Sequence, residues 1–342
     1  MTFRRFIQLL GLSALSCTSL VCIAVASDVP PPWAYGFEGP PPLQTALEQQ
    51  GPAPAAQSKL ATPDVRLRSL PGSELQFTAE QIHDPFGPAD WYPDDHPKMP
   101  SIVAHGNKPN VMACALCHYP NGKGRPENAA VAGLPVAYFI EQMQSFRNGS
   151  RKSADARKSN TNLMIAAAQA MTDEEIMAAA QYFGSMKWTP WVKVVETQWV
   201  PKTRISGGMF LPIKEDDEKE LLGERIIEVP HDVEAVTQLR NPRVGFIAYV
   251  PIGSLKRGSE LVTTGAGKTV ACGTCHGPDL SGTESVPGIA GRSPSYLVRQ
   301  MFDMKVGARS SVGAQLMKPV VSKLDEQDML AIAAYVASRD PS

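Results

Sequence analysis

Hydrophobic positions recur along the chain with two different spacings, and each spacing predicts a different kind of element. Apolar side chains three and four residues apart predict amphipathic helices over 137–147, 172–186, 295–305 and 325–338. Gly149 and Gly307 end the first and third of these helices. The second and fourth open with acidic residues, which suit a helix N-terminus. These segments are therefore expected to be the packing helices of small all-α domains.

The region 188–250 has another pattern, in which short β-branched and aromatic runs are separated by proline, glycine and a charged run at 214–220. This pattern predicts two or three strands, over 191–200, 225–229 and 245–250. We interpret the region as a hairpin-like connector. Its role is either a brace between two domains or a docking element for a partner, and the brace is the simpler interpretation.

The segment 27–96 is rich in proline. Fifteen of the thirty prolines fall between Pro30 and Pro100, so this extension is expected to wrap or trail along the molecule without a core of its own. Its later part, around Phe86, Trp91 and Tyr92, is expected to dock on the first domain.

The first 26 residues have the pattern of an export signal. Arg4 and Arg5 precede an apolar run over 6–25, and Ala24-Val25-Ala26 gives the small-x-small pattern of a cleavage site. The alternative is an uncleaved anchor helix, which would leave the protein at the membrane periphery.

Length, composition and charge narrow the classes of protein. A chain of 342 residues exceeds what one hydrophobic core usually organises, so two domains are expected. With 43% hydrophobic and 20% charged residues, the chain is neither a highly charged disordered protein nor a polytopic membrane protein. The formal net charge of -1 gives no electrostatic support to nucleic-acid binding.

Four cysteines carry the strongest chemical signal. Two of the six cysteines lie in the predicted signal, and the other four form two copies of Cys-x-x-Cys-His, at 114–118 and 272–276. In this motif two thiols reach the two vinyl groups of one porphyrin, and the adjacent histidine binds the iron. Two covalently attached c-type haems are thus predicted, held by Cys114, Cys117, Cys272 and Cys275, with His118 and His276 as iron ligands.

Three other uses of these cysteines are less compatible with the spacing. A thiol redox site needs no following histidine and should lie in a βαβ pattern, and 158 residues between the two pairs exceed the loops of zinc-ribbon sites. Ordinary disulfides are the third alternative. Export of the chain agrees with haem attachment.

The chain also contains an internal duplication. An offset of 158 maps the first motif onto the second, and an offset of 153 applies further on, after a loss of five residues. The matched pairs are Cys114/Cys272, Gly133/Gly291, Tyr138/Tyr296, Gln142/Gln300, Gly149/Gly307, Arg151/Arg309, Met164/Met317, Glu175/Asp328 and Tyr182/Tyr335.

This order of motifs resembles the class I cytochrome c fold, and the tandem arrangement is similar to the diheme cytochromes c of the bacterial periplasm. The resemblance implies a mainly α protein with cytochrome c-like domains at 97–187 and 251–342, joined by the β-containing connector. It also implies a methionine ligand on a loop before the last helix, at Met164 and Met317. A thioether is a neutral ligand that raises the reduction potential relative to a second imidazole. In the second copy Pro319 is expected to mark that loop, because proline disfavours helical geometry in the residue before it.

Other side chains compete for the axial positions. Met171 is the nearest rival of Met164, whereas Met143 and Met301 lie inside predicted amphipathic helices and are expected to pack. No histidine outside the motifs recurs between the copies, although His105 lies within reach of the first haem.

Further predictions concern the surroundings of the haems. Pro287 matches the family position whose carbonyl accepts the proximal imidazole N–H, and Ala129 takes its place in the first copy. Tyr119 replaces the glycine found at 277, so the first pocket is expected to differ in shape. Arg151 and Arg309 are candidates to pair with haem propionates, with an exposed structural role as the alternative.

Taken together, these features favour a periplasmic electron carrier that exchanges single electrons with a dehydrogenase, an oxidase or a small cytochrome. With both irons six-coordinate no position is open to a substrate. The alternative is a redox enzyme or its cytochrome subunit, such as a diheme peroxidase or an electron-accepting subunit of the alcohol-dehydrogenase type.

Overall fold

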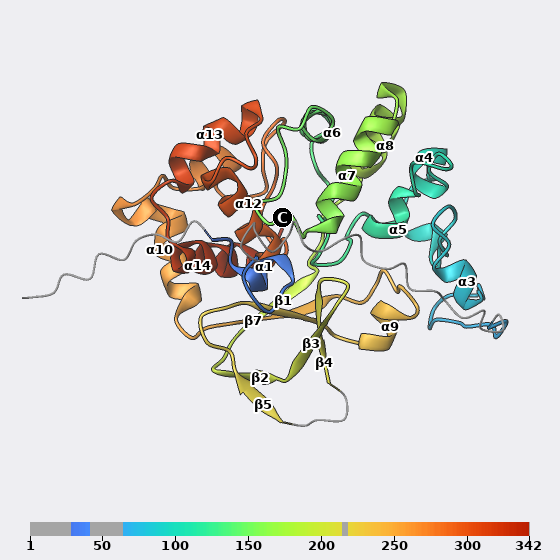
Figure 1. Cartoon of the computed structure of the whole chain (residues 1–342), viewed down its shortest axis with the longest axis horizontal. Coiled ribbons are helices and arrows are strands. Elements are labelled where there is room, and N and C mark those ends of the chain that lie inside the picture. Colours follow the sequence, from blue (N-terminus) through green and yellow to red (C-terminus); the bar gives the residue numbers. More distant parts are fainter. Residues whose placement is uncertain (1–28, 42–63, 214–217, 342) are drawn as a thin grey trace, which may run out of the picture.

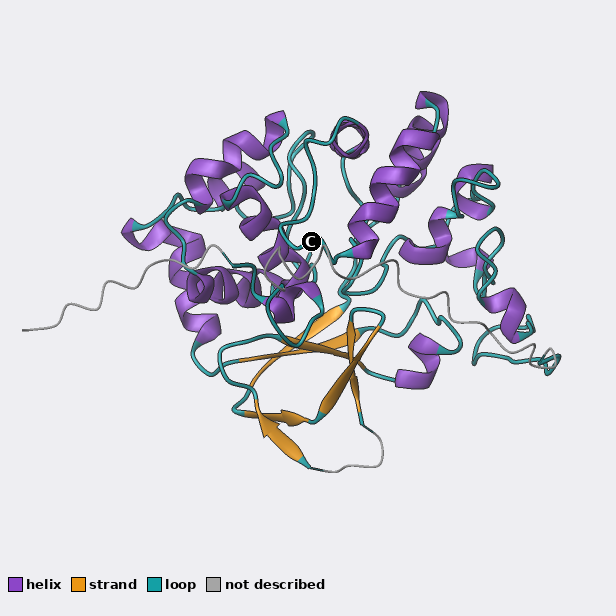
Figure 2. Ribbon diagram, viewed as in Figure 1, coloured by secondary structure: helices purple, strands orange, loops and turns teal. Residues whose placement is uncertain are grey.

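Two helical domains lie side by side on a smaller β region. The computed structural model describes residues 29–41, 64–213 and 218–341 (Figure 1). The predicted export signal lies outside the described residues. The strands gather below the two groups of helices (Figure 2). The predicted architecture of tandem helical domains with a β-containing connector is thereby confirmed.

The first domain is built around its three longest helices. It contains α4 (Ser101–Ala104), α5 (Cys114–His118), α6 (Val136–Arg147), α7 (Ser159–Ala170) and α8 (Asp173–Gly184). Helix α6 packs against both α7 and α8. Met143 and Phe146 of α6 share one buried cluster with Ile176 and Phe183 of α8. This cluster is the core of the first domain, and Cys114 and Ala115 attach the short α5 to it.

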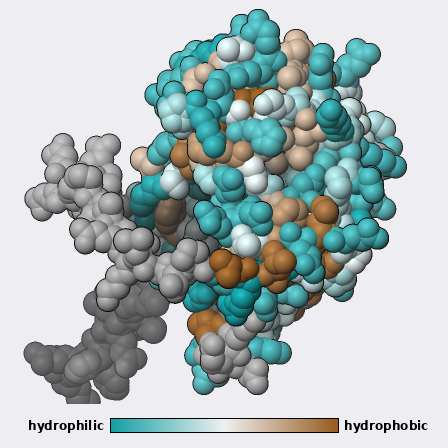
Figure 3. Space-filling model, turned by 90° about the vertical axis from the view of Figure 1, so that its right-hand side faces the viewer, coloured by the Kyte–Doolittle hydropathy of each residue, from teal (hydrophilic) through white to brown (hydrophobic). Residues whose placement is uncertain are grey.

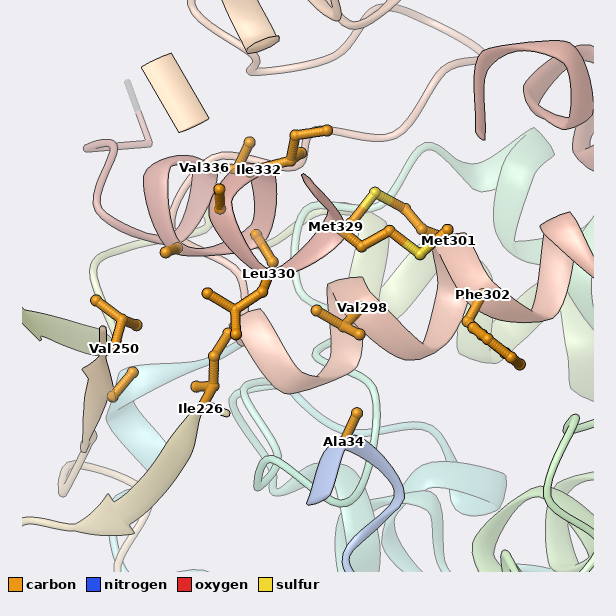
Figure 4. Close-up of a cluster of buried hydrophobic side chains, with 14 of the residues drawn as sticks. Ala34, Ile226, Val250, Val298, Met301, Phe302, Met329, Leu330, Ile332 and Val336 are labelled. Atoms are coloured by element: carbon orange, nitrogen blue, oxygen red, sulfur yellow. The ribbon is translucent and has the colours of Figure 1, made fainter. Parts of the chain in front are cut away.

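The second domain repeats this order with a longer first helix. It contains α10 (Ser254–Thr264), η2 (Gly265–Gly267), α11 (Gly273–His276), α12 (Pro294–Lys305), α13 (Val312–Val321) and α14 (Glu326–Ala337). Helices α10 and α14 touch backbone to backbone at Gly258, where a Cβ would overlap the carbonyl oxygen of Ala331. Met301 of α12 and Met329 of α14 meet in the core between them (Figure 4).

The predicted helix ends follow from capping. The last helix of each domain begins with a capping box, Thr172 with Glu175 and Asp325 with Asp328. Gly149 and Gly307 adopt φ values of 78° and 81° just after α6 and α12, a conformation that glycine takes without strain. The four predicted helices agree with α6, α8, α12 and α14 to within two residues.

The connector is more elaborate than the predicted hairpin. Its described residues, 188–213 and 218–250, contain the strands β1 (Val192–Glu196), β2 (Trp199–Pro201), β3 (Thr203–Ser206), β4 (Met209–Pro212), β5 (Lys219–Leu221), β6 (Ile227–Pro230) and β7 (Phe246–Val250), with α9 (Val233–Thr237) between the last two. They form a three-stranded sheet of order β1-β7-β6 and two ribbons, β2-β5 and β3-β4. Strand β1 pairs parallel to β7, with Val192 opposite Phe246. Strands this short, and a parallel pair this far apart in sequence, leave little periodic signal.

The connector packs into both domains. Trp188, Trp191 and Phe246 share a buried cluster with Tyr119 of the first domain. On its other side, Ile226 and Val250 enter the core of the second domain (Figure 4). The connector therefore packs against both domains, as the brace interpretation predicts, and a docking role for it stays a prediction.

The proline-rich extension also packs more firmly than predicted. Helix α1 (Pro32–Tyr35) inserts Trp33 and Tyr35 into the core of the second domain, and the Tyr35 hydroxyl donates to Asp303 at 2.7 Å. The expectation that the extension has no core of its own is wrong for its later part. That part contains α3 (Ala79–Ile82) and η1 (Pro93–Asp95) and forms a small buried cluster of Leu70, Ile82, Ala89, Trp91 and Tyr92. Aromatic side chains spaced among the prolines supply this core, and Trp91 donates to the carbonyl of Leu239 in the connector at 2.6 Å.

Among the described residues, none of the helices has the length and hydrophobicity needed to span a bilayer. On the face shown in Figure 3, hydrophilic residues predominate and hydrophobic ones form small separate groups.

Candidate metal centre

Each Cys-x-x-Cys-His motif forms one helical turn that aims its histidine inward. His118 ends α5 and His276 ends α11, and both side chains are buried. Their Nδ1 atoms lie 2.8 Å from the carbonyl oxygen of Ala129 and 2.9 Å from that of Pro287. Since a carbonyl only accepts, Nδ1 carries the proton in both rings and Nε2 is left free to bind a metal.

The protonation of both rings suits metal binding. Burial lowers the pKa of His118 and of His276, so both imidazoles are neutral at neutral pH. A neutral ring is the form that ligates a metal. The hydrogen bond to Pro287 is the one that the sequence predicts, and Ala129 takes the same place in the first domain with its backbone carbonyl.

None of the four motif cysteines forms a disulfide with another described residue. Burial raises the pKa of Cys114 to about 12 and that of Cys272 to about 11, so these thiols are neutral and not thiolates. In the described ranges, no group of three His, Cys, Asp or Glu side chains is placed to hold a metal ion. The residues therefore offer single histidine ligands beside paired thiols, and they do not offer a cysteine-rich zinc site.

Both motifs face one cavity of about 680 Å³ that the two domains share. Cys114, Cys117, His118 and Met164 line it from the first domain, and Cys272, Cys275, His276 and Met317 line it from the second. The duplication thus brings two equivalent sets of side chains into one apolar space.

The two candidate methionines lie on helices and not on loops. Met164 is in the middle of α7 and Met317 is in α13, which continues through Pro319 as far as Val321. The expected loop at Pro319 is wrong because a proline near the last turn removes a single helical hydrogen bond, a loss that the packing of α13 against α12 offsets. Met171 also lines the cavity, so the choice between it and Met164 stays a prediction.

His105 is not brought to this cavity. It is exposed, and its Nδ1 lies 3.3 Å from the carbonyl of Phe86. Tyr119 keeps a positive φ like its counterpart Gly277, and the predicted difference in the shape of the first pocket stays a prediction. The φ of Tyr119 is 61°, its ring is buried beneath the Arg240 guanidinium at 5.3 Å, and its hydroxyl lacks a hydrogen-bond partner in the described part of the chain.

Arg151 and Arg309 line the cavity where the two domains meet. Both are buried, so the alternative of an exposed arginine is wrong. Arg151 donates to Tyr296 and Gln300 of the second domain at 3.1 Å, and Arg309 donates to Tyr138 at 2.9 Å and Gln142 at 2.8 Å of the first. All six residues are equivalent positions of the internal repeat, but the repeat alone does not indicate that they contact each other across the domain boundary.

These arginines test whether the cavity fits haem. Every hydrogen bond that they make goes to a neutral oxygen, and the buried Nε of Arg309 has no partner among the described residues. Buried guanidinium groups are costly unless an anion compensates them. A haem carries two propionate carboxylates, so a pair of haems with their edges at the domain boundary fits the charge of this cavity.

Comparison with known proteins also indicates that the chain binds haem. The family model for cytochrome c matches residues 103–187 and 255–340, together half of the chain. The chain belongs to the cytochrome c family. Two such domains, each with its attachment motif, indicate two covalently bound c-type haems, and the protein is a diheme c-type cytochrome.

The curated relatives include thiosulfate dehydrogenase electron acceptors and cytochromes c4. The thiosulfate dehydrogenase electron acceptor of Stutzerimonas stutzeri is 35% identical over 68% of this chain and 82% of its own length. Cytochrome c4 of Pseudomonas aeruginosa is 39% identical and that of Azotobacter vinelandii 35% identical, each over 29% of this chain. The chain spans about half the length of these two cytochromes c4.

Solved structures that match include a thiosulfate dehydrogenase and cytochromes c4. The thiosulfate dehydrogenase TsdBA of Marichromatium purpuratum has a TM-score of 0.44 at 24% identity, over 70% of this chain and 39% of that one. Cytochrome c4 of Acidithiobacillus ferrooxidans has a TM-score of 0.42 at 21% identity, over 66% of this chain and 97% of that one.

Proposed function

We propose that this diheme cytochrome accepts single electrons from a periplasmic dehydrogenase and passes them to a second redox protein. The observation that carries the proposal is the shared cavity, because it places both attachment motifs on one internal space. Electrons entering at one centre can then leave at the other without crossing solvent.

In this proposal His118 and His276 would hold the two irons through Nε2, and Met164 and Met317, which line the same cavity, would be their second protein ligands. Haem supplies a reversible one-electron iron couple when it is bound. The chain's own residues would supply both ligands of each iron, and they hold the imidazoles through backbone carbonyls in a cavity with a mainly apolar lining. Closed axial positions favour transfer of electrons over chemistry on a substrate.

Four more side chains hold the porphyrins in this proposal. Cys114 and Cys117 form thioethers with the first, and Cys272 and Cys275 with the second. Arg151 and Arg309 would pair with propionates, because none of the hydrogen bonds that their guanidinium groups make among the described residues goes to a carboxylate.

The partner proposed here comes from the relatives. The two thiosulfate dehydrogenase electron acceptors are matched over 80% and 82% of their lengths, so a thiosulfate dehydrogenase is the first donor to test. The predicted signal over 1–26 supports export to the periplasm.

The test is a stopped-flow experiment with the purified ferric diheme protein. Thiosulfate dehydrogenase with thiosulfate should produce the ferrous spectrum at least tenfold faster than thiosulfate alone. A variant with Cys272→Ser and Cys275→Ser should take up half as many electrons. Equal rates with and without the dehydrogenase would contradict the proposed donor, and turnover of peroxide by the unaltered protein would contradict the role as a carrier.

A further inference from the structure

A single buried arginine connects the two loops that orient the proximal histidines. Arg292 follows the second motif and is 4% exposed. Its Nε donates to the carbonyl of Gly288 at 3.1 Å, and its two terminal nitrogens donate to the carbonyls of Ala130 and Ala132 at 3.0 Å. One guanidinium therefore spans both domains.

Two of these contacts are equivalent by the internal repeat. Gly288 immediately follows Pro287, whose carbonyl accepts from His276, and Ala130 immediately follows Ala129, whose carbonyl accepts from His118. The repeat offset of 158 maps Ala130 onto Gly288. Arg292 thus holds the same backbone position in both loops, one residue from each imidazole acceptor.

The bridge itself is not duplicated. The residue equivalent to Arg292 in the first domain is Leu134, so the internal repeat does not mark Arg292 as a shared feature of the two domains. Trp188 of the connector completes the bridge. Its ring lies 4.4 Å from the guanidinium, and its Nε1 donates to the carbonyl of Ala290 at 3.0 Å.

Arg292 remains charged in this setting. Burial lowers its pKa to about 10, which still leaves the guanidinium cationic at neutral pH. All its hydrogen bonds go to backbone carbonyls, and its side chain lines the shared cavity. It is thus a fixed positive charge at the boundary of both candidate centres.

We propose that Arg292 is a positioning residue that holds both proximal loops and, as a shared buried cation, raises the reduction potentials of both haems. The inference rests on the proposed ligation by His118 and His276. Reduction removes one positive charge from each iron, so a nearby buried cation favours the ferrous form. The guanidinium fork also fixes the carbonyls next to the two imidazole acceptors, which an ammonium group cannot do with the same geometry.

The experiment compares Arg292→Met, Arg292→Lys and Arg339→Met in the diheme protein by spectroelectrochemical titration. Arg339 is an exposed arginine of the same domain and is the matched control for charge. Arg292→Met should lower both midpoint potentials, Arg292→Lys should lower them less, and Arg339→Met should leave both nearly unchanged. Unchanged potentials in Arg292→Met, or a shift equal to that of the control, would overturn the proposal.

A second measurement tests whether the bridge acts across the domains. The Arg292→Met change is placed in the Cys272→Ser, Cys275→Ser protein, which keeps only the first haem. The potential of that haem should still fall, although Arg292 belongs to the other domain. No change there would overturn the shared role, even if the second haem responds in the complete protein.

A purely structural effect of this bridge would change the stability of the protein and leave the reduction potentials unchanged, and Trp188→Phe tests this. Trp188→Phe removes the indole N–H that binds Ala290 and leaves the charge in place, so it should lower the resistance to urea without lowering the potentials. If Trp188→Phe shifts the potentials as much as Arg292→Met, the charge is not the cause. Failure of the proposed ligation is seen separately, as the absence of the methionine-to-iron absorption band in the unaltered protein.

Discussion

Arg151 and Arg309 lie opposite each other in an isolated antiparallel bridge, and each donates to a tyrosine of the other's domain. Backbone bonds flank the pair, from Lys152 N–H to the Ala308 carbonyl at 2.8 Å and from Ser310 N–H to the Ser150 carbonyl at 2.7 Å. The duplication has therefore produced a near-symmetric joint, in which equivalent residues exchange partners across the boundary.

This joint predicts the effect of removing either tyrosine hydroxyl. Tyr138→Phe and Tyr296→Phe each delete one acceptor of a buried guanidinium, so each should lower the free energy of unfolding by about 1–2 kcal/mol. The measurement is urea unfolding of the diheme protein followed by circular dichroism. Tyr335→Phe is the control, because that hydroxyl makes no hydrogen bond within the described residues. Losses no larger than those of the control would contradict the importance of the joint.

The proposed methionine ligands predict a stepwise change in the ferric spectrum. Met164→Ala and Met317→Ala should each remove about half of the methionine-to-iron band near the red end of the visible. Each should also lower the potential of the altered centre, because loss of the thioether disfavours ferrous iron. Met177→Ala, at an exposed position of α8, should change neither property. Loss of the band in Met171→Ala and its retention in Met164→Ala would show that Met171 is the ligand.

Glu228 predicts a pH-dependent stability. It is 2% exposed, and burial raises its pKa to about 7, although Ser293 donates to its carboxylate at 2.7 and 3.0 Å. In the unfolded chain the pKa of a glutamate is about 4.3. Between these two pKa values the unfolded state loses its proton first, so the folded state loses stability as pH rises from about 4 to 7 and then no further.

Glu228→Gln should remove this dependence. Relative to the unaltered protein, the variant should gain about 3 kcal/mol of stability on going from pH 4 to pH 8, an order-of-magnitude figure from the difference in pKa. Urea unfolding at both pH values measures the gain. Glu234→Gln, at an exposed position of α9, is the matched control and should show no such difference. If the variant instead loses stability relative to the unaltered protein between pH 4 and pH 8, Glu228 is ionised in the folded protein and stabilises it.

The close contact of α10 with α14 predicts that Gly258→Ala destabilises the second domain. The new methyl group would overlap the Ala331 carbonyl and lie 2.7 Å from the Cβ of Tyr335. Alanine gains about 1 kcal/mol in helix propensity, but overpacking costs about 1–3 kcal/mol or more where backbone is the neighbour, so the net effect is destabilising. Thermal unfolding measures it. Gly39→Ala, where no heavy atom lies within 4 Å of the new methyl group, should be tolerated, and equal behaviour of the two variants would contradict the contact.

Sequence periodicity predicted the elements whose determinants are local. Apolar spacing and capping residues placed α6, α8, α12 and α14, because a helix depends on residues three and four apart. The sequence does not predict the helical position of Met317, since the proline rule at Pro319 describes local preference and packing overrides it near a helix end. The loop expected at Met164 came only from the family resemblance, and Met164 also lies in a helix. The pairing of β1 with β7 was missed because it joins strands about fifty residues apart, with no local signal.

The sequence by itself determined the chemistry of this protein, since cysteines, histidine and their spacing within five residues specify covalent haem attachment, and the repeat specifies two such centres. Only the tertiary structure decided how the two centres are joined. Arg292 reaches carbonyls 160 and 162 residues away, and Arg151 and Arg309 exchange partners across the domain boundary. Such contacts depend on how two folded domains pack, and the order of residues along the chain does not encode that packing in any short-range pattern.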